Sequence, residues 1–499
     1  MLDHIKSFLR HSVVYSISNV AVKAMGVILL PLYTKFISLE DFGKLAIIEV
    51  SLSIAVEIFL LGQGQSIIMF NDLDEFKERL NSIFFTLFIM LSVPALIIFG
   101  LIFLLQPALP NLLYIAPSSL VYIKLGVIIV FLRVLNTFFL EKIRADQKPL
   151  KYTITNVSKL FISLGCIIIF IAVLRYGIMG ILYSYLIAES IIFIYLLSTM
   201  LRQMKAKIEK SIISIALKFG VPLIFSSIAY MILNVSDRYM IKYMDGNSSV
   251  ALYDLGYRVA GTLNMFLIMP FTLSLMPNAY KMFGTPGDKR YYSKLMTYLC
   301  FTLVWGGLVL SLFGEELIKF FSLNPDYWPS YHVVPIIVFS YVFSGLLLMA
   351  LLGQYLTKNT KSIAYYTVLA AILNILLNII FIPKYGYIAA AYTTLVSYFA
   401  LFVVSYLISN RYYPIPFEIK KLLQIFVTGI VVYLAVSVLR TNNSLIEILI
   451  KLLAIIIFPF LLYFWKFYEK QEINAITGFL IKWKNLKEWK SYIQQKPLK

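Results

Sequence analysis

Apolar residues in this chain are gathered into long runs that short polar segments separate. Fourteen runs can be drawn, each of roughly 19–29 residues, the length that a helix needs to cross the ~30 Å hydrocarbon core of a bilayer. Their approximate limits are 13–37, 45–70, 81–105, 117–140, 152–174, 177–199, 216–236, 250–280, 295–313, 332–356, 362–382, 387–409, 419–439 and 444–465. The pattern predicts an all-α polytopic membrane protein with 14 transmembrane helices.

The composition agrees with this prediction and narrows the function. Of the 499 residues, 60% are hydrophobic and 14% are charged, whereas a soluble protein carries roughly 25% charged residues. The two cysteines, Cys166 and Cys300, lie far apart in apolar runs, so neither a disulfide framework nor a metal site is expected. No string typical of ATP hydrolysis or of a hydrolase occurs. We therefore expect neither an enzyme nor a resident cofactor.

Basic residues alternate along the chain in a way that predicts topology. With the N-terminus in the cytoplasm, 30 of the 44 Lys and Arg residues lie in cytoplasmic segments, 10 in outer loops and 4 within spans. Because cytoplasmic loops carry an excess of Lys and Arg, this asymmetry predicts that both termini are cytoplasmic. The net charge of +19 then reflects topology, and no nucleic-acid partner is expected.

An internal repeat divides the predicted helices. RYGIMGILYSYLIAE at 175–189 resembles KYGYIAAAYTTLVSY at 384–398, six helices later, although two short apolar turns can also look alike by chance. A repeat of six helices keeps the same orientation in the membrane. We expect two pseudo-symmetric six-helix bundles, an extra helix pair and an amphipathic basic tail on the cytoplasmic leaflet, unless that tail is merely a solvated charged segment. The ranges are 1–200, 216–409, 419–465 and 469–499 respectively.

Ionisable and polar residues inside the spans are the candidates for function, because charges at membrane depth normally face water or a partner. In the first span, Asn19 and Lys23 continue a polar stripe that begins at Ser12 and Ser16. Ammonium and guanidinium groups in a cavity would suit a phosphate-bearing substrate. The substrate-binding candidates are Lys23, Arg258, Arg133, Lys159, Asn19 and Arg238.

Acidic residues in the spans are candidates for binding a coupling H⁺ or Na⁺. They are Glu57, Glu189, Asp237 and Glu49. Other interpretations stay open: Lys23 and Glu57 can form a structural ion pair, Lys159 can snorkel to the cytoplasmic surface, and Glu49 can lie near the outer interface.

Two segments carry a family resemblance: LLPLYTKFISLEDFGKLAIIE at 29–49 and LNVSDRYMIKYMDGNSSVALYDLGYRVAG at 233–261. With the repeated RYG and KYG turns, they resemble bacterial polysaccharide flippases of the O-antigen transporter type. These belong to the superfamily that also contains the multidrug and toxin extrusion antiporters and the lipid II flippase. The resemblance implies two facing bundles, alternating access and transport of undecaprenyl-pyrophosphate-linked oligosaccharide from the cytoplasmic to the periplasmic leaflet of the bacterial inner membrane.

The resemblance also bears on individual residues. Lys23 and Arg258 are similar in position to basic cavity residues in the first and eighth helices of the lipid II flippase, Arg258 by its distance to Pro277. A second arginine of that first helix has no counterpart here, so Arg133 or Lys159 is expected to share the role. Asp41 resembles an acidic residue at the outer end of helix 1 and joins the ion-coupling candidates.

Two other functions compete with the flippase. A cation-coupled multidrug antiporter of the same fold should have an acidic cavity and usually twelve helices. A membrane-embedded glycosyltransferase or polymerase typically has a large extracytoplasmic loop, whereas the longest outer loops here, about 237–250 and 314–331, are short. A flippase would work with membrane lipids, a lipid-linked oligosaccharide, a polysaccharide polymerase and chain-length regulators.

Overall fold

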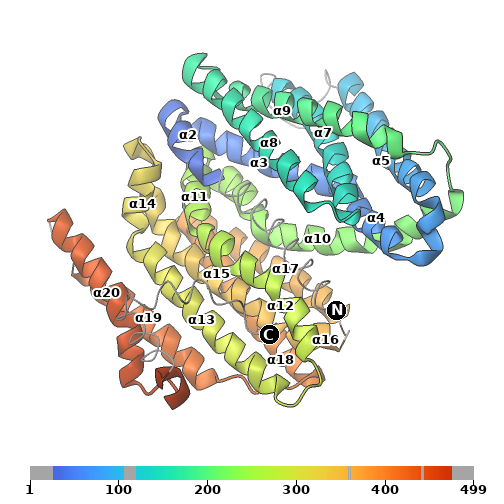
Figure 1. Cartoon of the computed structure of the whole chain (residues 1–499). Helices are drawn as coiled ribbons and strands as arrows, with labels where there is room; N and C mark the ends of the chain where they lie inside the picture. The colour runs from blue at the N-terminus through green and yellow to red at the C-terminus, as the bar shows by residue number, and fades with distance from the viewer. Residues whose placement is uncertain (1–25, 106–119, 358, 360, 440–442, 475–499) are drawn as a thin grey trace, which may run out of the picture.

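The computed structural model describes residues 26–105, 120–357, 359, 361–439 and 443–474. Within these ranges nearly every residue is helical and no β-strand occurs. The helices run side by side as a bundle (Figure 1). The predicted all-α class is therefore confirmed.

The first half of the chain contains the helices up to α9 and its short continuation η4. Their bounds are α2 (Leu30–Phe36), α3 (Leu39–Leu60), α4 (Gln63–Asp72), η1 (Asp74–Arg79), α5 (Leu80–Leu105), α7 (Leu120–Ala145), α8 (Pro149–Ile167), the π-helical η3 (Ile168–Val173), α9 (Gly177–Met200) and η4 (Leu201–Gln203).

The second half begins with the long helix α10. Its bounds, with those of the remaining helices, are α10 (Lys210–Met244), α11 (Asn247–Ala260), the π-helical η5 (Asn264–Ile268), α12 (Met269–Met282), α13 (Asp288–Leu312), α14 (Gly314–Phe321), η6 (Pro325–His332), α15 (Val333–Ala350), α16 (Leu352–Leu356), α17 (Lys361–Tyr385), α18 (Tyr387–Tyr412), α19 (Ile419–Val438) and α20 (Ser444–Phe464).

Fewer than the fourteen predicted membrane spans can be identified in the part of the chain that the structure describes. The described part of the chain holds 11 helices that are long and apolar enough to cross a bilayer, or 12 if the bent pair α3–α4 is one span. Of the other predicted spans, 216–236 lies within α10, and most of 13–37 lies outside the described residues. The multi-pass architecture is thus established, while the count of fourteen remains a prediction.

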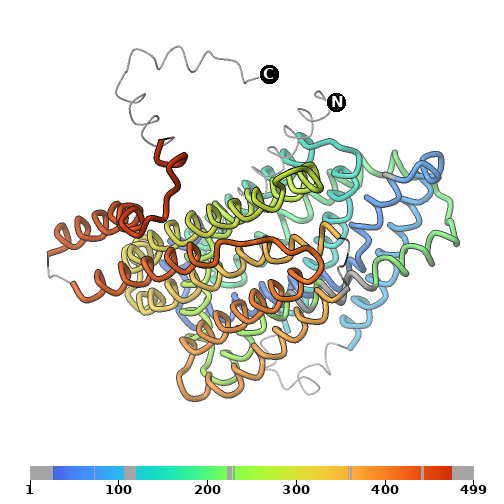
Figure 2. The backbone as a smooth tube through the Cα atoms, turned by 90° about the horizontal axis from the view of Figure 1, so that it is seen from below, coloured from blue at the N-terminus to red at the C-terminus, as the bar shows by residue number. Residues whose placement is uncertain are grey.

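The helices form two groups with an additional pair at one side. In Figure 1 the helices α2 to α9 lie together, α11 to α18 form a second group, and α10 runs along the boundary between them. Helix α20 lies at the outer edge of the molecule in both views (Figure 1, Figure 2). Only 17% of the most apolar stretch of α20 is buried, against 72% for the segment Pro325–Leu356. The additional pair therefore presents apolar side chains outward, as a lipid-facing element does.

The two similar turns found in the sequence have similar backbone geometry. Gly177 begins α9 with φ +55°, and Gly386 precedes α18 with φ +65°. Glycine adopts such left-handed angles without steric cost, because it lacks a Cβ. The shared turn gives α9 and α18 the same kind of start in the two halves.

Helix α3 joins the two halves. Ser38 caps its start by accepting a hydrogen bond from the Asp41 amide at 3.2 Å. Near this end α3 crosses α11 so closely that a Cβ on Gly43 would lie 1.8 Å from the Asn247 carbonyl oxygen. At the opposite end a Cβ on Gly62 would lie 2.6 Å from the Gly220 carbonyl oxygen of α10. The first half thus contacts the second half at both ends of one helix.

Candidate functional site

A cavity of about 620 Å³ lies along the middle of α3, between these two contacts. We call it the inter-half cavity, because the first half supplies most of its wall and α11 of the second half supplies Arg258. Its lining residues are Gly26, Leu29, Tyr33, Glu49, Ser53, Arg133, Asn156, Lys159, Leu160, Ser163, Tyr185, Ala188, Glu189 and Arg258. The cavity is therefore walled by six helical segments.

An ion pair on the cavity wall joins the two halves. Arg258 Nη2 lies 2.6 Å from Glu49 Oε2 of α3, and Arg258 Nε lies 2.6 Å from Asp254 Oδ2 one turn earlier on α11. The Tyr185 hydroxyl of α9 donates to the second oxygen of Glu49 at 2.6 Å. The Glu49 carboxylate thus receives one donor from each half, and it lies where relative motion of the halves would break its bond to Arg258.

A second cluster of charges lies within the first half. Arg133 Nε of α7 and Lys159 Nζ of α8 each lie 2.9 Å from Oε1 of Glu189, a residue of α9 that is 1% exposed. Asn136 Nδ2 donates to Oε2 of the same carboxylate at 2.9 Å. An isolated charge at this depth would be strongly unfavourable. The Glu189 carboxylate and the two bases therefore stabilise one another.

The wall of the inter-half cavity carries more positive than negative charge. Arg133, Lys159 and Arg258 line it, against the acids Glu49 and Glu189. Side chains of Arg133, Lys159 and Arg258 keep 24%, 28% and 20% of their surface exposed, so each base also reaches the cavity. A phosphate entering the cavity could accept charge-assisted hydrogen bonds from these groups, each worth about 1.5–3 kcal/mol.

A smaller space adjoins the inter-half cavity on the side of the second half. This adjoining pocket measures about 230 Å³ and shares Gly26 and Arg258 with the larger cavity. Its other lining residues are Val27, Tyr257, Gly261, Thr262, Asn264, Met265 and Tyr341. The rings of Tyr257 and Tyr341 are 5.6 Å apart in an edge-on arrangement. Aromatic rings with nearby hydroxyl and amide groups form a neutral polar surface beside the charged one.

A third polar cluster is buried inside the second half, around Asp237 of α10. Its carboxylate is 0% exposed and accepts hydrogen bonds from Tyr253 at 2.6 Å, Asn378 at 2.7 Å and Thr394 at 2.8 Å. Asn374 adds a carbonyl oxygen that accepts from Asn378 at 3.2 Å. Among the ion pairs of the described residues, none includes Asp237. Three uncharged donors therefore hold this buried carboxylate.

The structure places the predicted binding residues in three different surroundings. Arg258, Arg133 and Lys159 lie on the cavity wall, whereas Lys23 and Asn19 lie outside the described residues. Arg238 does not line the cavity: its guanidinium lies 3.1 Å from Asp254 and 4.2 Å from the ring centroid of Tyr257, which keeps it 5% exposed within the second half. Arg238 is therefore not among the residues that line the inter-half cavity.

The acidic candidates also separate. Glu49 and Glu189 line the cavity, Asp237 is buried in the second half, and Glu57 belongs to α3 but does not line the cavity. Asp41 lies in the first turn of α3 and pairs with Lys44 at 3.1 Å, so its placement at the end of helix 1 is corrected. The reason is local, because Ser38 caps α3 and starts that helix before Asp41.

Two side chains of the site were not singled out from the sequence. Asn136 holds Glu189, and Tyr185 holds Glu49. A signal existed for both: Asn136 follows Arg133 by three residues and Tyr185 precedes Glu189 by four, so each shares a helix face with a predicted residue.

Family comparison complements this geometry. The model of the family described as polysaccharide biosynthesis protein matches residues 8–283, more than half of the chain. The chain belongs to this family. A second family model, MatE, matches residues 222–380 of the chain. No curated protein matches the chain.

Solved structures show the same fold. The lipid II flippase MurJ in an inward closed conformation matches with a TM-score of 0.72 and 18% identity, over 90% of this chain and 99% of that one. An inward-facing multidrug resistance MATE family transporter of the MOP superfamily matches with a TM-score of 0.62 and 14% identity, over 80% and 94% of the two chains. The protein therefore shares the fold of this flippase and of this transporter.

A third neighbour comes from Pyrococcus furiosus. This MOP superfamily transporter, for which reverse polarity of the binding pocket suggests a different function, matches with a TM-score of 0.59 and 14% identity. The match covers 81% of this chain and 95% of that one. At such identities the likeness concerns the fold, so the substrate has to be argued from the cavity of this chain.

Proposed function

We propose that this protein is a flippase that moves undecaprenyl-pyrophosphate-linked oligosaccharide from the cytoplasmic to the periplasmic leaflet by alternating access. The observation that carries the proposal is the inter-half cavity, where three bases face two acids and one base belongs to the opposite half. A pyrophosphate can bind such a wall, while the polyprenyl chain stays in the bilayer. A neutral or cationic substrate would not need this excess of bases.

The ion pairs suggest how binding is linked to movement. In the unloaded protein, Glu49 satisfies Arg258 across the halves and Glu189 satisfies Arg133 and Lys159. A pyrophosphate that takes Arg258 from Glu49 removes one of the bonds that hold the halves together. Substrate binding therefore favours the separation of the halves, and loss of the substrate restores the bond.

The adjoining pocket suits the first sugars of the substrate. Tyr257 and Tyr341 offer aromatic faces, and Thr262 and Asn264 offer hydrogen-bonding groups. Because Arg258 borders both spaces, a pyrophosphate held by Arg258 would place the attached sugar against these residues.

We place the coupling ion, Na⁺ or H⁺, at Asp237 rather than at Glu49 or Glu189. The two cavity acids are occupied by bases, whereas Asp237 is surrounded by Asn378, Thr394 and Tyr253. The Asp237 carboxylate and, once their protons turn away from it, the hydroxyl oxygens of Tyr253 and Thr394 are ligands of the kind that hard cations prefer, which favours Na⁺. We expect Asp237→Asn to abolish the sodium dependence of transport. Unchanged stimulation by a sodium gradient in proteoliposomes would remove Asp237 from this role.

The proposal places the protein in the bacterial inner membrane, with both termini in the cytoplasm. A polysaccharide polymerase and chain-length regulators on the periplasmic side are the partners that would use the exported unit. The cation-coupled multidrug antiporter is the second candidate, because the MatE model also matches. An excess of bases on the cavity wall argues against organic cations as substrates.

Complementation of a deletion strain tests the flippase. We expect Arg258→Ala to lower surface polysaccharide at least tenfold, because the cavity loses the base nearest to both spaces. Lys77→Ala, which removes a base that is 61% exposed outside the cavity, is the matched control. Both variants are compared at equal membrane abundance. Normal polysaccharide with Arg258→Ala, or altered drug resistance with intact polysaccharide in the deletion strain, would contradict the proposal.

A further inference from the structure

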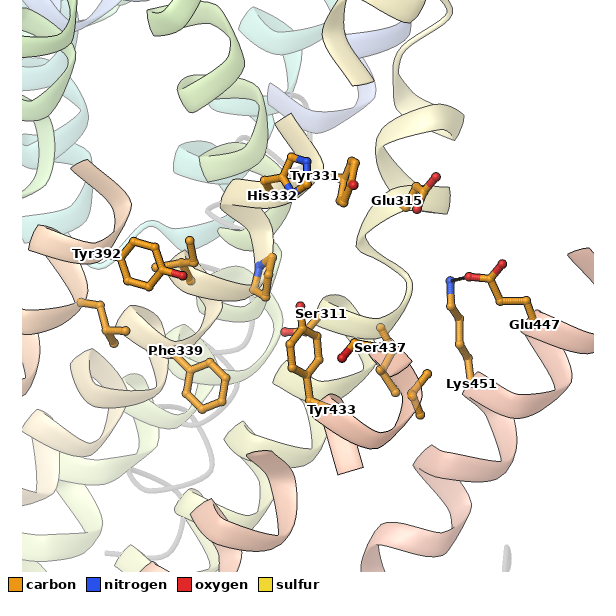
Figure 3. Close-up of a pocket in the computed structure, with 15 residues that line it drawn as sticks. Ser311, Glu315, Tyr331, His332, Phe339, Tyr392, Tyr433, Ser437, Glu447 and Lys451 are labelled. Carbon is orange, nitrogen blue, oxygen red and sulfur yellow. Dashed lines mark ion pairs between the residues drawn. The ribbon is translucent and has the colours of Figure 1, made fainter. Parts of the chain in front are cut away.

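A second large cavity lies on the opposite side of the second half from the inter-half cavity, and shares no residue with it. This outer pocket measures about 380 Å³ and lies between the helices α13 to α15, α18 and the additional pair α19–α20 (Figure 3). Among its lining residues are Glu315, Phe339, Tyr433, Ser437, Glu447 and Lys451.

The outer pocket lies at one end of the helices that form it. Helix α13 ends at Leu312, α19 ends at Val438 and α20 begins at Ser444, so the pocket gathers residues from the same ends of these helices. Under the predicted topology these are the outer ends. Its polar groups are therefore at the depth of lipid headgroups.

A narrow apolar crevice of only about 10 Å³ adjoins the outer pocket. It shares Ser311, Phe339 and Tyr433 with the pocket and is otherwise lined by Val304, Gly307, Leu308, Val338, Val342 and Gly429. Val304 lies eight residues before the end of α13, or roughly 12 Å along a helix. That depth is close to half of the ~30 Å hydrocarbon core. The crevice has room for about one water molecule, so a lipid bound at the outer pocket would keep its acyl chains in the bilayer, against the exposed apolar side chains of α20.

The charges of the outer pocket select among lipids. Glu315 and Glu447 line it with a single base, Lys451, which pairs with Glu447 at 2.9 Å and also with Glu316. Two neighbouring residues join these charges: Glu316, and Lys319, which pairs with Glu315 at 2.7 Å. With them the group holds three acids and two bases. A headgroup with only negative charge would be repelled. An ammonium group would gain from the carboxylates and from the aromatic faces nearby.

We propose that the outer pocket binds a phospholipid with a primary-amine headgroup, of the phosphatidylethanolamine class, taken from the outer leaflet. The ammonium group binds on the wall that carries Glu315 and Glu447, which Figure 3 shows on the side away from Tyr392 and Phe339. Tyr433 and Ser437 of α19 supply hydroxyl groups for the phosphodiester, Ser437 by turning from the Leu434 carbonyl oxygen to which it donates at 2.7 Å, and the acyl chains stay in the bilayer. Bound in this way, the lipid contacts α19 and α20 as well as α13 and α15.

Native mass spectrometry of the detergent-purified full chain tests this proposal, with dioleoyl-phosphatidylethanolamine and dioleoyl-phosphatidylglycerol as probes. We expect at least fivefold tighter binding of the ethanolamine lipid. Ser437→Trp should abolish binding by filling the pocket, while Leu439→Trp, on the exposed end of the same helix, should leave it unchanged. The double substitution Glu315→Gln/Glu447→Gln should remove the preference between the lipids and keep binding itself.

Three outcomes would overturn the proposal: equal affinity of the wild-type chain for the two lipids, wild-type binding by Ser437→Trp, or displacement of the lipid by undecaprenyl phosphate or by a neutral oligosaccharide. The last result would reassign the site to the carrier lipid or to a glycan. The measurement uses no transport step, so its outcome is independent of whether the flippase proposal holds.

Discussion

At the scale of the residue, charges at membrane depth occur as shared pairs. Glu189 is almost completely buried and holds two bases, whereas Arg133 and Lys159 keep about a quarter of their side chains exposed to the cavity. The buried Glu189 carboxylate therefore relies on the two bases for its stabilisation, whereas each base can also be solvated from the cavity. Removing one base leaves the other in place, but removing both leaves a buried carboxylate with only the Asn136 amide beside it.

This asymmetry predicts that the effects of the two bases on stability are not additive. Arg133→Met and Lys159→Met should each lower the free energy of unfolding by about 1–2 kcal/mol. The double variant should lose about 1–3 kcal/mol beyond the sum, because an unpaired buried charge is strongly unfavourable. Denaturant unfolding in detergent micelles measures the four free energies of the cycle. Additive losses would mean that Glu189 is solvated from the cavity.

At the scale of the element, close helix crossings depend on glycine. Helix α3 contacts α11 at Gly43 and its extension contacts α10 at Gly62, with the cavity residues Glu49 and Ser53 between them. At both crossings the atom facing the glycine is a backbone oxygen, which no rotamer change can move aside. A larger residue must therefore displace a helix. Under the proposed function, these crossings would close the two ends of the cavity.

Gly43→Ala should open the end of the molecule near α11. The new Cβ would lie 1.8 Å from the Asn247 oxygen, so the two helices must move apart. The nearby Thr34 is 1% exposed and contacts the backbone of Phe321 and Leu323 in the second half. A cysteine at Thr34, in a background without the native cysteines, should react with a soluble maleimide at least tenfold faster in the Gly43→Ala variant.

The control is Gly100→Ala, because a Cβ there meets no atom within 4 Å. It should leave the labelling rate of the Thr34 cysteine unchanged. If Gly43→Ala labels at the control rate while remaining folded by thermal unfolding, α3 and α11 do not form the closing contact.

At the scale of the whole molecule, charged side chains fasten the end of the described chain to the second half. Lys294 of α13 lies 3.1 Å from Glu418 and also pairs with Glu469, which follows α20. Lys421 of α19 lies 3.0 Å from Glu418 and 3.3 Å from Glu469. The segment after α20 is thereby tied to the ends of α13 and α19 that the topology predicts to be cytoplasmic.

The attachment of this segment should depend on pH. Hydrogen bonds from Lys294, and secondarily from Lys421, hold the pKa of Glu469 below its ordinary value of 4.5. A lowered pKa in the folded state means that these contacts stabilise the segment above pH 4.5, and that their contribution is lost as the pH falls below that value. The protection of residues 465–474 against hydrogen–deuterium exchange, corrected for the intrinsic dependence of exchange on pH, should therefore fall below pH 4.5.

The variant Glu469→Gln should show the faster exchange already at neutral pH, with a flatter dependence on pH. Lys470→Gln, which changes a neighbouring residue outside these ion pairs, serves as the control. If the protection of the wild-type segment stays level from pH 7 to 3.5, the ion pairs do not hold the segment.

Several features followed from the sequence because they depend on local chemistry. Hydrocarbon cannot satisfy backbone polar groups, so long apolar runs have to become helices. Three further features can be predicted from the sequence alone: the bases at helix ends, the glycine turns at Gly177 and Gly386, and the depth of Arg133, Lys159 and Arg258. For this reason the all-α class, the multi-pass architecture and the main bases of the cavity could be predicted.

Tertiary structure alone decided which of these charges face the same space. Arg238 and Arg258 are both basic residues at membrane depth, and Asp254 lies within 3.1 Å of both, but only Arg258 reaches the cavity because α11 turns it toward Glu49 of the other half. Sequence spacing fixes the face of a helix that a residue occupies, but not the neighbour which that face meets. The partners Glu49–Arg258, 209 residues apart, are set by the packing of the two halves.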